Sequence, residues 1–178
     1  MLAGAEDGAM AASVEELKAY LRIEHDGEDD LLLRLLRGAA ALCEQFVGQW
    51  LIARAARETV AGDGRWLRLS ARPVRAIERV EAVGLDGALE ALPVGAYAID
   101  IDAAGDGWVR STRIGDRRVL AVEYRAGLAE TADGVPHALR QGIVRLAAEH
   151  FAARGTESAT PPAVVSALWR PWRRMRLT

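Results

Sequence analysis

The stretch RVLAVEYRAGLAETADGVPHALRQGIVRLAAEHFAARG, from Arg118 to Gly155, changes its hydrophobic period near its middle. Its first ten residues have the short period and the β-branched content of a strand. From Pro136 onward apolar residues recur at helical spacing, and Pro136 itself suits the first helical position. Gly155 supplies the cap at which many helices end. The stretch therefore predicts a strand that leads into a helix over residues 136–154, which indicates a mixed α and β chain.

The strand-like pattern extends back to residue 57, with turn residues between its segments. Gly62-Asp63-Gly64 and Asp86-Gly87 are typical of hairpin turns, and a further turn is expected at 104–107. The region 57–125 therefore predicts a small antiparallel sheet or a set of hairpins. Its candidate strands are ETVAG, RWLRLS, AIERVEAV, GALEAL, YAIDID, GWVR and RVLAVEYRAG.

Two helices are expected before the strands. Ser13 and Glu16 have the spacing of a capping box, which predicts a helix over 13–23. A broad apolar stripe predicts a second helix over 27–48, with acidic residues in its first turn and Gly48 at its end.

The expected fold class is α+β. It consists of a small helical bundle, made of two N-terminal helices and one C-terminal helix, with an inserted antiparallel β-hairpin region and an extended C-terminal arm. Residues 1–12 are expected to be a disordered arm and residues 13–155 a single domain. Residues 156–178 are expected to form a linker, stiffened by Pro161 and Pro162, and then the arm.

Composition limits the classes of protein to which the chain can belong. The formal net charge is −2, so overall charge gives no indication of a nucleic-acid partner. Cys43 is the single cysteine, which excludes a disulfide framework within one chain. No apolar run approaches the roughly 20 residues of a membrane-spanning helix, and the first residues lack the pattern of a signal peptide.

Catalytic and metal-binding templates do not match the chain. The acidic loop at 24–30 lacks the ligand spacing of a calcium loop, and the spacing of Asp100, Asp102 and Asp106 fails the same test. Cys43 lies in an apolar helical stripe, as a small hydrophobic residue would. No catalytic residue, metal ligand or cofactor is therefore assigned. A small enzyme with a site among Asp100, Asp102 and His25 remains a distant alternative.

The chain closes with ALWRPWRRMRLT, from Ala167 to Thr178, which holds two tryptophans, four arginines and no acid. Three interpretations remain open. The indoles pack back on their own domain, or the segment binds nucleic acid through arginine and stacked indoles, or it docks on another protein.

The order of these parts resembles the head–tail connector (adaptor) proteins of tailed bacteriophages and of gene transfer agents. LRIEHDGEDDLLLRLLRGAAALCEQFVGQ is similar to the opening loop and long helix of that family. RPVRAIERVEAVGLDGALEALPVGAYAID is similar to its middle hairpins, and VEYRAGLAETADGVPHALRQGIVRLAAEHFAARG to the entry into its last helix. ALWRPWRRMRL resembles its closing tail. The resemblance covers about residues 13–177.

The resemblance implies a structural, non-enzymatic protein of the virion, assembled in the bacterial cytoplasm and located at the head–tail interface. It implies a ring of about a dozen copies beneath the portal protein, which extends the DNA channel and carries a tail-side stopper or tail-terminator protein. DNA would pass without specific binding, and no membrane is involved. The alternative from another class is a DNA-binding module that uses the arginine- and tryptophan-rich tail.

The resemblance also implies two sets of site residues. The portal-docking residues would be Leu168, Trp169, Arg170, Pro171, Trp172, Arg173, Arg174 and Arg176. Because a ring needs two different complementary faces on each copy, charged residues on the two long helices are candidates for contacts between copies. These are Arg34, Arg37, Glu44, Arg140, Arg145 and Glu149, and ordinary solvated helix faces would explain them equally well.

Overall fold

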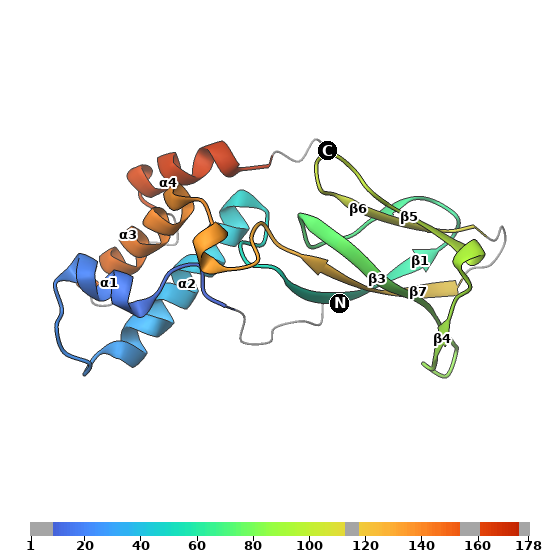
Figure 1. Cartoon of the computed structure of the whole chain (residues 1–178), viewed down its shortest axis with the longest axis horizontal. Coiled ribbons are helices and arrows are strands. Elements are labelled where there is room, and N and C mark those ends of the chain that lie inside the picture. The colour runs from blue at the N-terminus through green and yellow to red at the C-terminus, as the bar shows by residue number, and fades with distance from the viewer. Residues whose placement is uncertain (1–8, 113–117, 154–160, 175–178) are drawn as a thin grey trace. The chain divides into compact units, whose positions relative to one another are not determined.

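The computed structural model describes residues 9–112, 118–153 and 161–174 (Figure 1). Within these ranges the chain forms two compact units. Residues 53–128 form the β unit, and residues 9–52 together with the chain from 129 onward form the helical unit. The predicted α+β class is confirmed, and the inserted β region forms a compact unit of its own. In the described part of the chain no helix is long and apolar enough to cross a bilayer.

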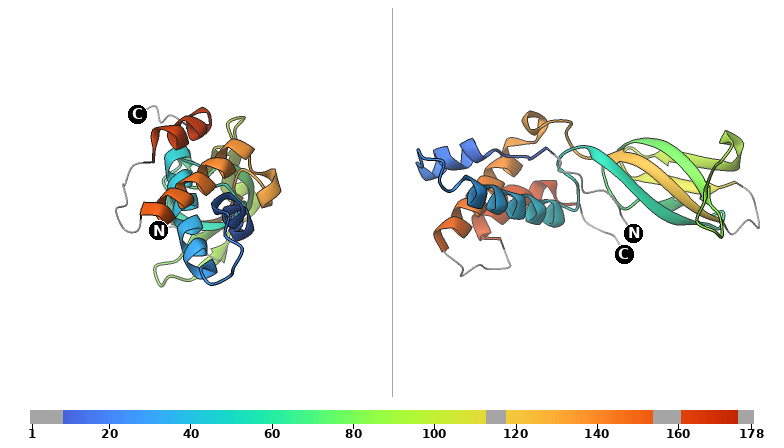
Figure 2. Two further views of the ribbon diagram at one scale, coloured as in Figure 1. Left: turned by 90° about the vertical axis from the view of Figure 1, so that its left-hand side faces the viewer. Right: turned by 90° about the horizontal axis from the view of Figure 1, so that it is seen from below.

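The described residues of the helical unit form four α-helices. They are α1 (Val14–Leu21), α2 (Asp29–Val47), α3 (His137–Ala153) and α4 (Ala163–Trp169), with short 3-10 turns η2 (Ala132–Gly134) and η3 (Arg170–Trp172). Helix α3 lies beside both α2 and α4 (Figure 2). The core forms where their apolar stripes meet, and its fully buried members include Leu17, Leu32, Leu36, Leu139 and Ile143.

The ends of the first two helices follow the sequence signals. The hydroxyl of Ser13 accepts a hydrogen bond from the Glu16 N–H at 3.2 Å, and the Glu16 carboxylate accepts one from the Ser13 N–H at 2.9 Å. Gly48 ends α2 with a φ of 70°, a conformation that glycine adopts without steric cost. The predicted capping box and glycine cap are both confirmed.

The predicted disordered arm over residues 1–12 is wrong at its inner end. Ala11 and Ala12 are 3% and 2% exposed, because their small side chains pack into the protein just before α1. Residues 1–8 lie outside the described part of the chain.

The described residues of the β unit form seven strands in two antiparallel sheets. The four-stranded sheet has the order β1-β7-β3-β4, with β1 (Arg54–Gly62), β7 (Arg118–Ala126), β3 (Val74–Val83) and β4 (Leu89–Ala91). The three-stranded sheet has the order β2-β6-β5, with β2 (Leu67–Arg68), β6 (Gly107–Ser111) and β5 (Tyr97–Ile101), and η1 (Val94–Ala96) precedes β5. The antiparallel pairing matches the prediction, and the hairpin segments divide between two sheets.

The inner faces of the two sheets pack on each other, with β5 and β6 over β3 and β7 (Figure 1). Gly107 on β6 lies so close to β3 that a Cβ atom there would be 2.7 Å from the Val74 Cγ2. Val109 and Val122 are fully buried between the sheets. The β unit is therefore a small sandwich whose two outer faces point in opposite directions.

A buried polar cluster ties the sheet to the segment after β2. The Tyr124 hydroxyl donates to the Glu58 carboxylate at 3.0 Å and accepts from the Ala71 N–H at 3.0 Å. Glu58 also accepts from the Ser70 N–H at 2.7 Å and from the Ser70 hydroxyl at 2.6 Å. Burial raises the pKa of Tyr124 above its usual value, so the phenol stays protonated and the cluster stays satisfied.

Candidate functional site

The carboxy-terminal segment is the site to which the sequence analysis assigned docking. Its described part begins at Pro161 and Pro162, forms α4, and turns through η3 before it ends at Arg174. Arg176 lies outside the described residues. Pro162 precedes the first helical residue of α4, and Pro171 lies in η3, where a regular α-helix would lose a hydrogen bond. Residues 163–169 are helical, whereas the sequence analysis expected an extended arm over this part of the chain.

Trp169, at the end of α4, is fully buried in the helical unit. Its Nε1–H donates a hydrogen bond to the Leu139 carbonyl at 3.3 Å, and its ring centre lies 5.7 Å from that of Phe46 at an angle of 56°. Gly142 provides the space, because a Cβ atom there would lie 2.1 Å from the Trp169 Nε1. The indole is therefore a core residue with its polar atom satisfied.

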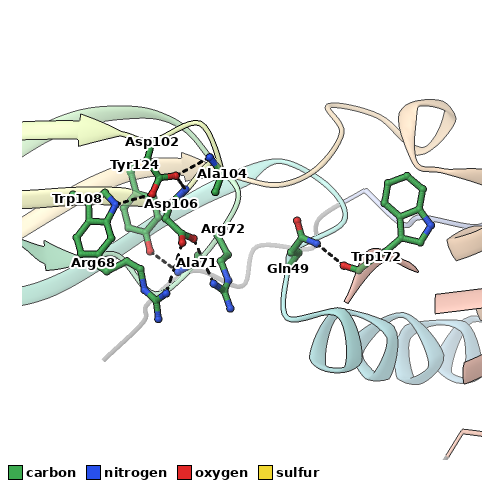
Figure 3. Close-up of polar contacts among 10 residues, drawn as sticks. All are labelled: Gln49, Arg68, Ala71, Arg72, Asp102, Ala104, Asp106, Trp108, Tyr124 and Trp172. Carbon is green, nitrogen blue, oxygen red and sulfur yellow. Dashed lines mark hydrogen bonds and ion pairs between the residues drawn. The ribbon is translucent and has the colours of Figure 1, made fainter. Parts of the chain in front are cut away.

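Trp172 and the residues after it contact the end of α2. The Gln49 side-chain N–H donates to the Trp172 carbonyl at 2.9 Å (Figure 3), and the Arg174 N–H donates to the Val47 carbonyl at 3.1 Å. The Arg173 guanidinium lies 5.5 Å from the centre of the Phe46 ring, within the range of a cation–π contact. Both Val47 and Gln49 belong to the helical unit, so the segment returns to its own unit.

These contacts leave only part of the C-terminal segment exposed for docking. Of the docking residues that the resemblance implied, Trp169 is buried in its own helical unit, where Gly142 on α3 leaves space for the indole. Leu168, Trp172 and Arg174 are half-buried, whereas Arg170, Pro171 and Arg173 are exposed. We use the name C-terminal surface for Arg170, Pro171 and Arg173 together with the solvent-exposed edge of Trp172.

Two of the predicted copy-to-copy residues are engaged within the helical unit. The Glu44 carboxylate accepts from the Leu51 N–H at 2.9 Å and so fixes the chain after α2. Arg140 pairs with Glu16 and lies 3.8 Å from the Asp133 carboxylate, which ties α3 to the start of α1. Both residues therefore have a structural use that explains their charge.

The remaining candidates lie at the surface. Arg34 and Arg37 are exposed on α2, and Glu149 is exposed on α3. Arg145 and Glu149 line an open groove between α1, α3 and α4, together with Tyr20 and Val164. The six candidates are thus spread over several surfaces of the helical unit.

Lys18 on α1 contacts the acidic loop between α1 and α2 and the start of α2. The Lys18 ammonium donates to the carboxylates of Asp26 and Asp29, the latter at 3.0 Å. These hydrogen bonds lower the pKa of Asp26 and raise that of Lys18. The described residues contain no group of three or more His, Cys, Asp or Glu placed to hold a metal ion. The loop is therefore a connection between two helices that is bound by a lysine of α1.

Asp102 and Asp106 stabilise the turn between β5 and β6 (Figure 3), and Asp100 lies within β5. Asp102 accepts from the N–H groups of Ala104 and Asp106, each at 2.9 Å, and from the Trp108 Nε1–H at 3.1 Å. The Asp106 carboxylate lies 3.4 Å from the Arg72 guanidinium and 3.7 Å from that of Arg68. Asp102 and Asp106 therefore stabilise a polar hairpin.

Cys43 is fully buried on α2, and burial raises the pKa of its thiol far above the usual range. A thiol that stays protonated is a poor nucleophile. Its predicted role as a small hydrophobic residue is confirmed by its place in the core.

Sequence reasoning missed one surface of the β unit. Trp66, Arg68, Trp108 and Arg110 gather on the outer face of the three-stranded sheet, and we call them the Trp–Arg face. Arg68 is paired with Trp108 in the register, and the Arg110 guanidinium lies 4.8 Å from the centre of the Trp66 ring. The signal was present as two segments, WLR and WVR, in which tryptophan and arginine are two residues apart and so share one face of a strand.

Comparisons with known proteins identify similar folds. No protein-family model and no curated protein matches the sequence. Several chains of solved structures are similar, and in three of them the match covers 100% of this chain and 97% of the other. A chain from the neck of an empty GTA particle, computed with C6 symmetry, has a TM-score of 0.82 at 23% identity. A chain from the virion of a native gene transfer agent (GTA) particle has 0.79 at 25% identity, and one from the neck of a native GTA particle, computed with C12 symmetry, has 0.75 at 24%.

Proposed function

We propose that this chain is a structural, non-catalytic protein of a virion neck, and that it acts as the head–tail adaptor. In this role it forms a ring beneath the portal protein, extends the DNA channel and provides the platform for a tail-side stopper or tail-terminator protein. The observation that carries the proposal is the whole-length likeness to chains of gene transfer agent necks. The sequence motifs that resemble phage adaptors support it independently.

The ring is supported by the symmetry of the similar structures. Two of them are necks computed with C6 and C12 symmetry, which are cyclic arrangements around one axis. A cyclic arrangement leaves an axial opening through which DNA can pass. The overall charge of −2 suits such a channel, because it does not favour tight binding of a polyanion.

The C-terminal surface is the proposed contact with the portal. Buried Trp169 anchors α4 on α3, so that Arg170, Pro171 and Arg173 are presented from a fixed position. Two exposed arginines suit an acidic partner surface, and the half-buried Trp172 offers an apolar edge beside them. Preorganisation lowers the ordering cost of docking compared with a free arm. Leu168 and Arg174 border this surface, and Arg176 follows it in the sequence.

The adaptor role is tested by removing the chain from cells that produce the particle. Electron microscopy should show DNA-filled heads and separate tails in place of joined particles. Expression of the full chain from a plasmid should restore joining. Joined particles in the complete absence of the chain would contradict the proposal.

The portal contact is tested by Arg170→Gln and Arg173→Gln, alone and combined, in the full chain. The double variant should bind purified portal protein more weakly, because charge-assisted hydrogen bonds to the partner are lost. Arg22→Gln, which changes another exposed arginine of the helical unit, is the matched control. Equal binding by the double variant and the control would place the portal contact elsewhere.

The DNA-binding alternative makes a different prediction about salt. When a protein binds phosphates, the logarithm of its binding constant falls with the logarithm of the salt concentration, with a slope of about −0.9 for each contact. The double variant removes two arginines, so its slope should be shallower by the equivalent of about two contacts. A steep slope on duplex DNA, combined with normal portal binding by the double variant, would favour the alternative.

A further inference from the structure

The outer face of the four-stranded sheet carries an apolar row that crosses all four strands. The register pairs Ala61 with Val119, Val119 with Val83, and Val83 with Leu89. Directly paired residues point to the same side of a sheet, and the residues next to them, such as Leu120 and Ala82, are buried inside the sandwich. We call Ala61, Val83, Leu89 and Val119 the apolar row.

The apolar row lies open to solvent in the single chain. Val119 is 44% exposed and Leu89 is 45% exposed, and Leu85 at the tip of the β3–β4 hairpin is fully exposed. Contiguous exposed apolar side chains on a sheet face mark contact surfaces more often than scattered single ones do. The row is therefore a candidate contact surface.

The Trp–Arg face on the other sheet is also open. Trp66 is 42% exposed, and Arg68 and Trp108 lie beside it on the same face. Tryptophan and arginine are the residues most enriched where protein interfaces carry their binding energy. Asp106 pairs with Arg68, Asp102 accepts from the Trp108 indole, and the exposed Asp100 adds a negative charge next to Trp108. This balance of charge fits a protein partner better than a polyanion.

The two surfaces lie on opposite outer faces of one sandwich. Gly107 and Val74 meet between the sheets, so the side chains that alternate with them point away on either side. A subunit of a closed ring touches its two neighbours through two different surfaces on opposite sides. The β unit has this arrangement within a single compact unit.

We propose that the apolar row of one copy packs against the Trp–Arg face of the next copy, and that this heterologous contact closes the ring. The inference rests on the proposed function and assigns its copy-to-copy contact to the β unit. Arg79 on the outer face of the four-stranded sheet is ion-paired with Glu81 and Glu123, so the apolar row has no unbalanced charge beside it on β3. The similar chains come from necks computed with cyclic symmetry, in which copies that touch do so through two different faces.

The experiment uses two full-length variants that each break one surface. Val119→Arg places a charge in the apolar row, and Trp66→Glu removes the indole and adds an acid to the Trp–Arg face. Each variant alone should self-associate more than about tenfold more weakly than the wild type, as expected for a residue at the centre of an interface. Sedimentation velocity over a concentration series measures this association.

Mixing the two variants gives the decisive result. The intact Trp–Arg face of Val119→Arg can still bind the intact apolar row of Trp66→Glu, and neither partner can bind a further copy. The mixture should therefore form a 1:1 dimer that neither variant forms alone. Val164→Arg is the matched control, because Val164 is 46% exposed and lies in the helical unit, and it should assemble as the wild type does.

Three results would overturn the inference. They are wild-type assembly by either variant, a mixture that shows no dimer, and a wild-type chain that stays monomeric throughout the concentration series. Circular dichroism spectra that match the wild type exclude misfolding as the cause of lost assembly. Particle joining, tested by removing the chain from cells, reports separately on the adaptor role, so that role can stand when the β-unit contact fails.

Discussion

The helical unit and the β unit place their indoles differently. In the helical unit Trp169 is fully buried, and its Nε1–H is satisfied by the Leu139 carbonyl. In the β unit Trp66 remains 42% exposed, and the apolar row on the four-stranded sheet is exposed to solvent. The difference separates residues that stabilise the chain itself from residues whose burial requires a second molecule.

The largest expected effect compares Trp169→Ala with Trp66→Ala. Loss of the buried indole should lower the free energy of unfolding by about 3–5 kcal/mol, through lost burial and a residual cavity. Loss of the exposed indole should lower it by about 1 kcal/mol or less, since only a surface contact with Arg110 is lost. Urea unfolding followed by circular dichroism measures both. Equal destabilisation by the two variants would show that Trp66 contributes as much to the stability of the chain as Trp169 does.

A smaller effect is expected inside the β unit from Tyr124→Phe. The change removes the hydroxyl that accepts from the Ala71 N–H and leaves that buried donor unsatisfied, while Glu58 keeps its two hydrogen bonds from Ser70. The free energy of unfolding should fall by about 1–3 kcal/mol. Ring assembly should persist, because Tyr124 faces the sandwich interior. Loss of assembly by a folded Tyr124→Phe would weaken the division between core and contact residues.

The smallest effect concerns pH and the loop between α1 and α2. Lys18 lowers the folded-state pKa of Asp26 below its ordinary value of 3.8, so the pair contributes stability above that pH and loses it as pH falls through the folded pKa. Lys18→Met removes this contribution. Its melting temperature should therefore fall less than that of the wild type between pH 5 and the acid range below about 3.8. Identical acid dependence would show that the pair is broken in solution.

The helices and strands were predictable because their signals are local. The capping box at Ser13 and Glu16, Gly48 at the end of α2, and the hairpin turn at Asp86-Gly87 each act within a few residues. The partner of β1 was not predictable in this way. Arg54–Gly62 pairs with Arg118–Ala126, about sixty residues later, and a local pattern carries no information on that distance.

The candidate site was predicted only in part. The composition of the C-terminal segment indicated that its indoles need burial, but the place of burial depends on Gly142, a residue on another helix. Glu44 and Arg140 carried the charge expected of contact residues, yet their partners are Leu51, Glu16 and Asp133 of the same chain. The Trp–Arg face was not predicted, because it combines strands that are about forty residues apart.

The sequence by itself determined the class of fold, the positions of the helices and strands, and the absence of a recognisable catalytic template, because all of these depend on period, capping and spacing along the chain. Only the tertiary structure decided that Trp169 belongs to the core, while Trp66 and the apolar row remain open. The physical reason is that burial depends on which surfaces meet in space. A glycine at 142 and the opposition of two sheets are properties of packing that no single segment contains.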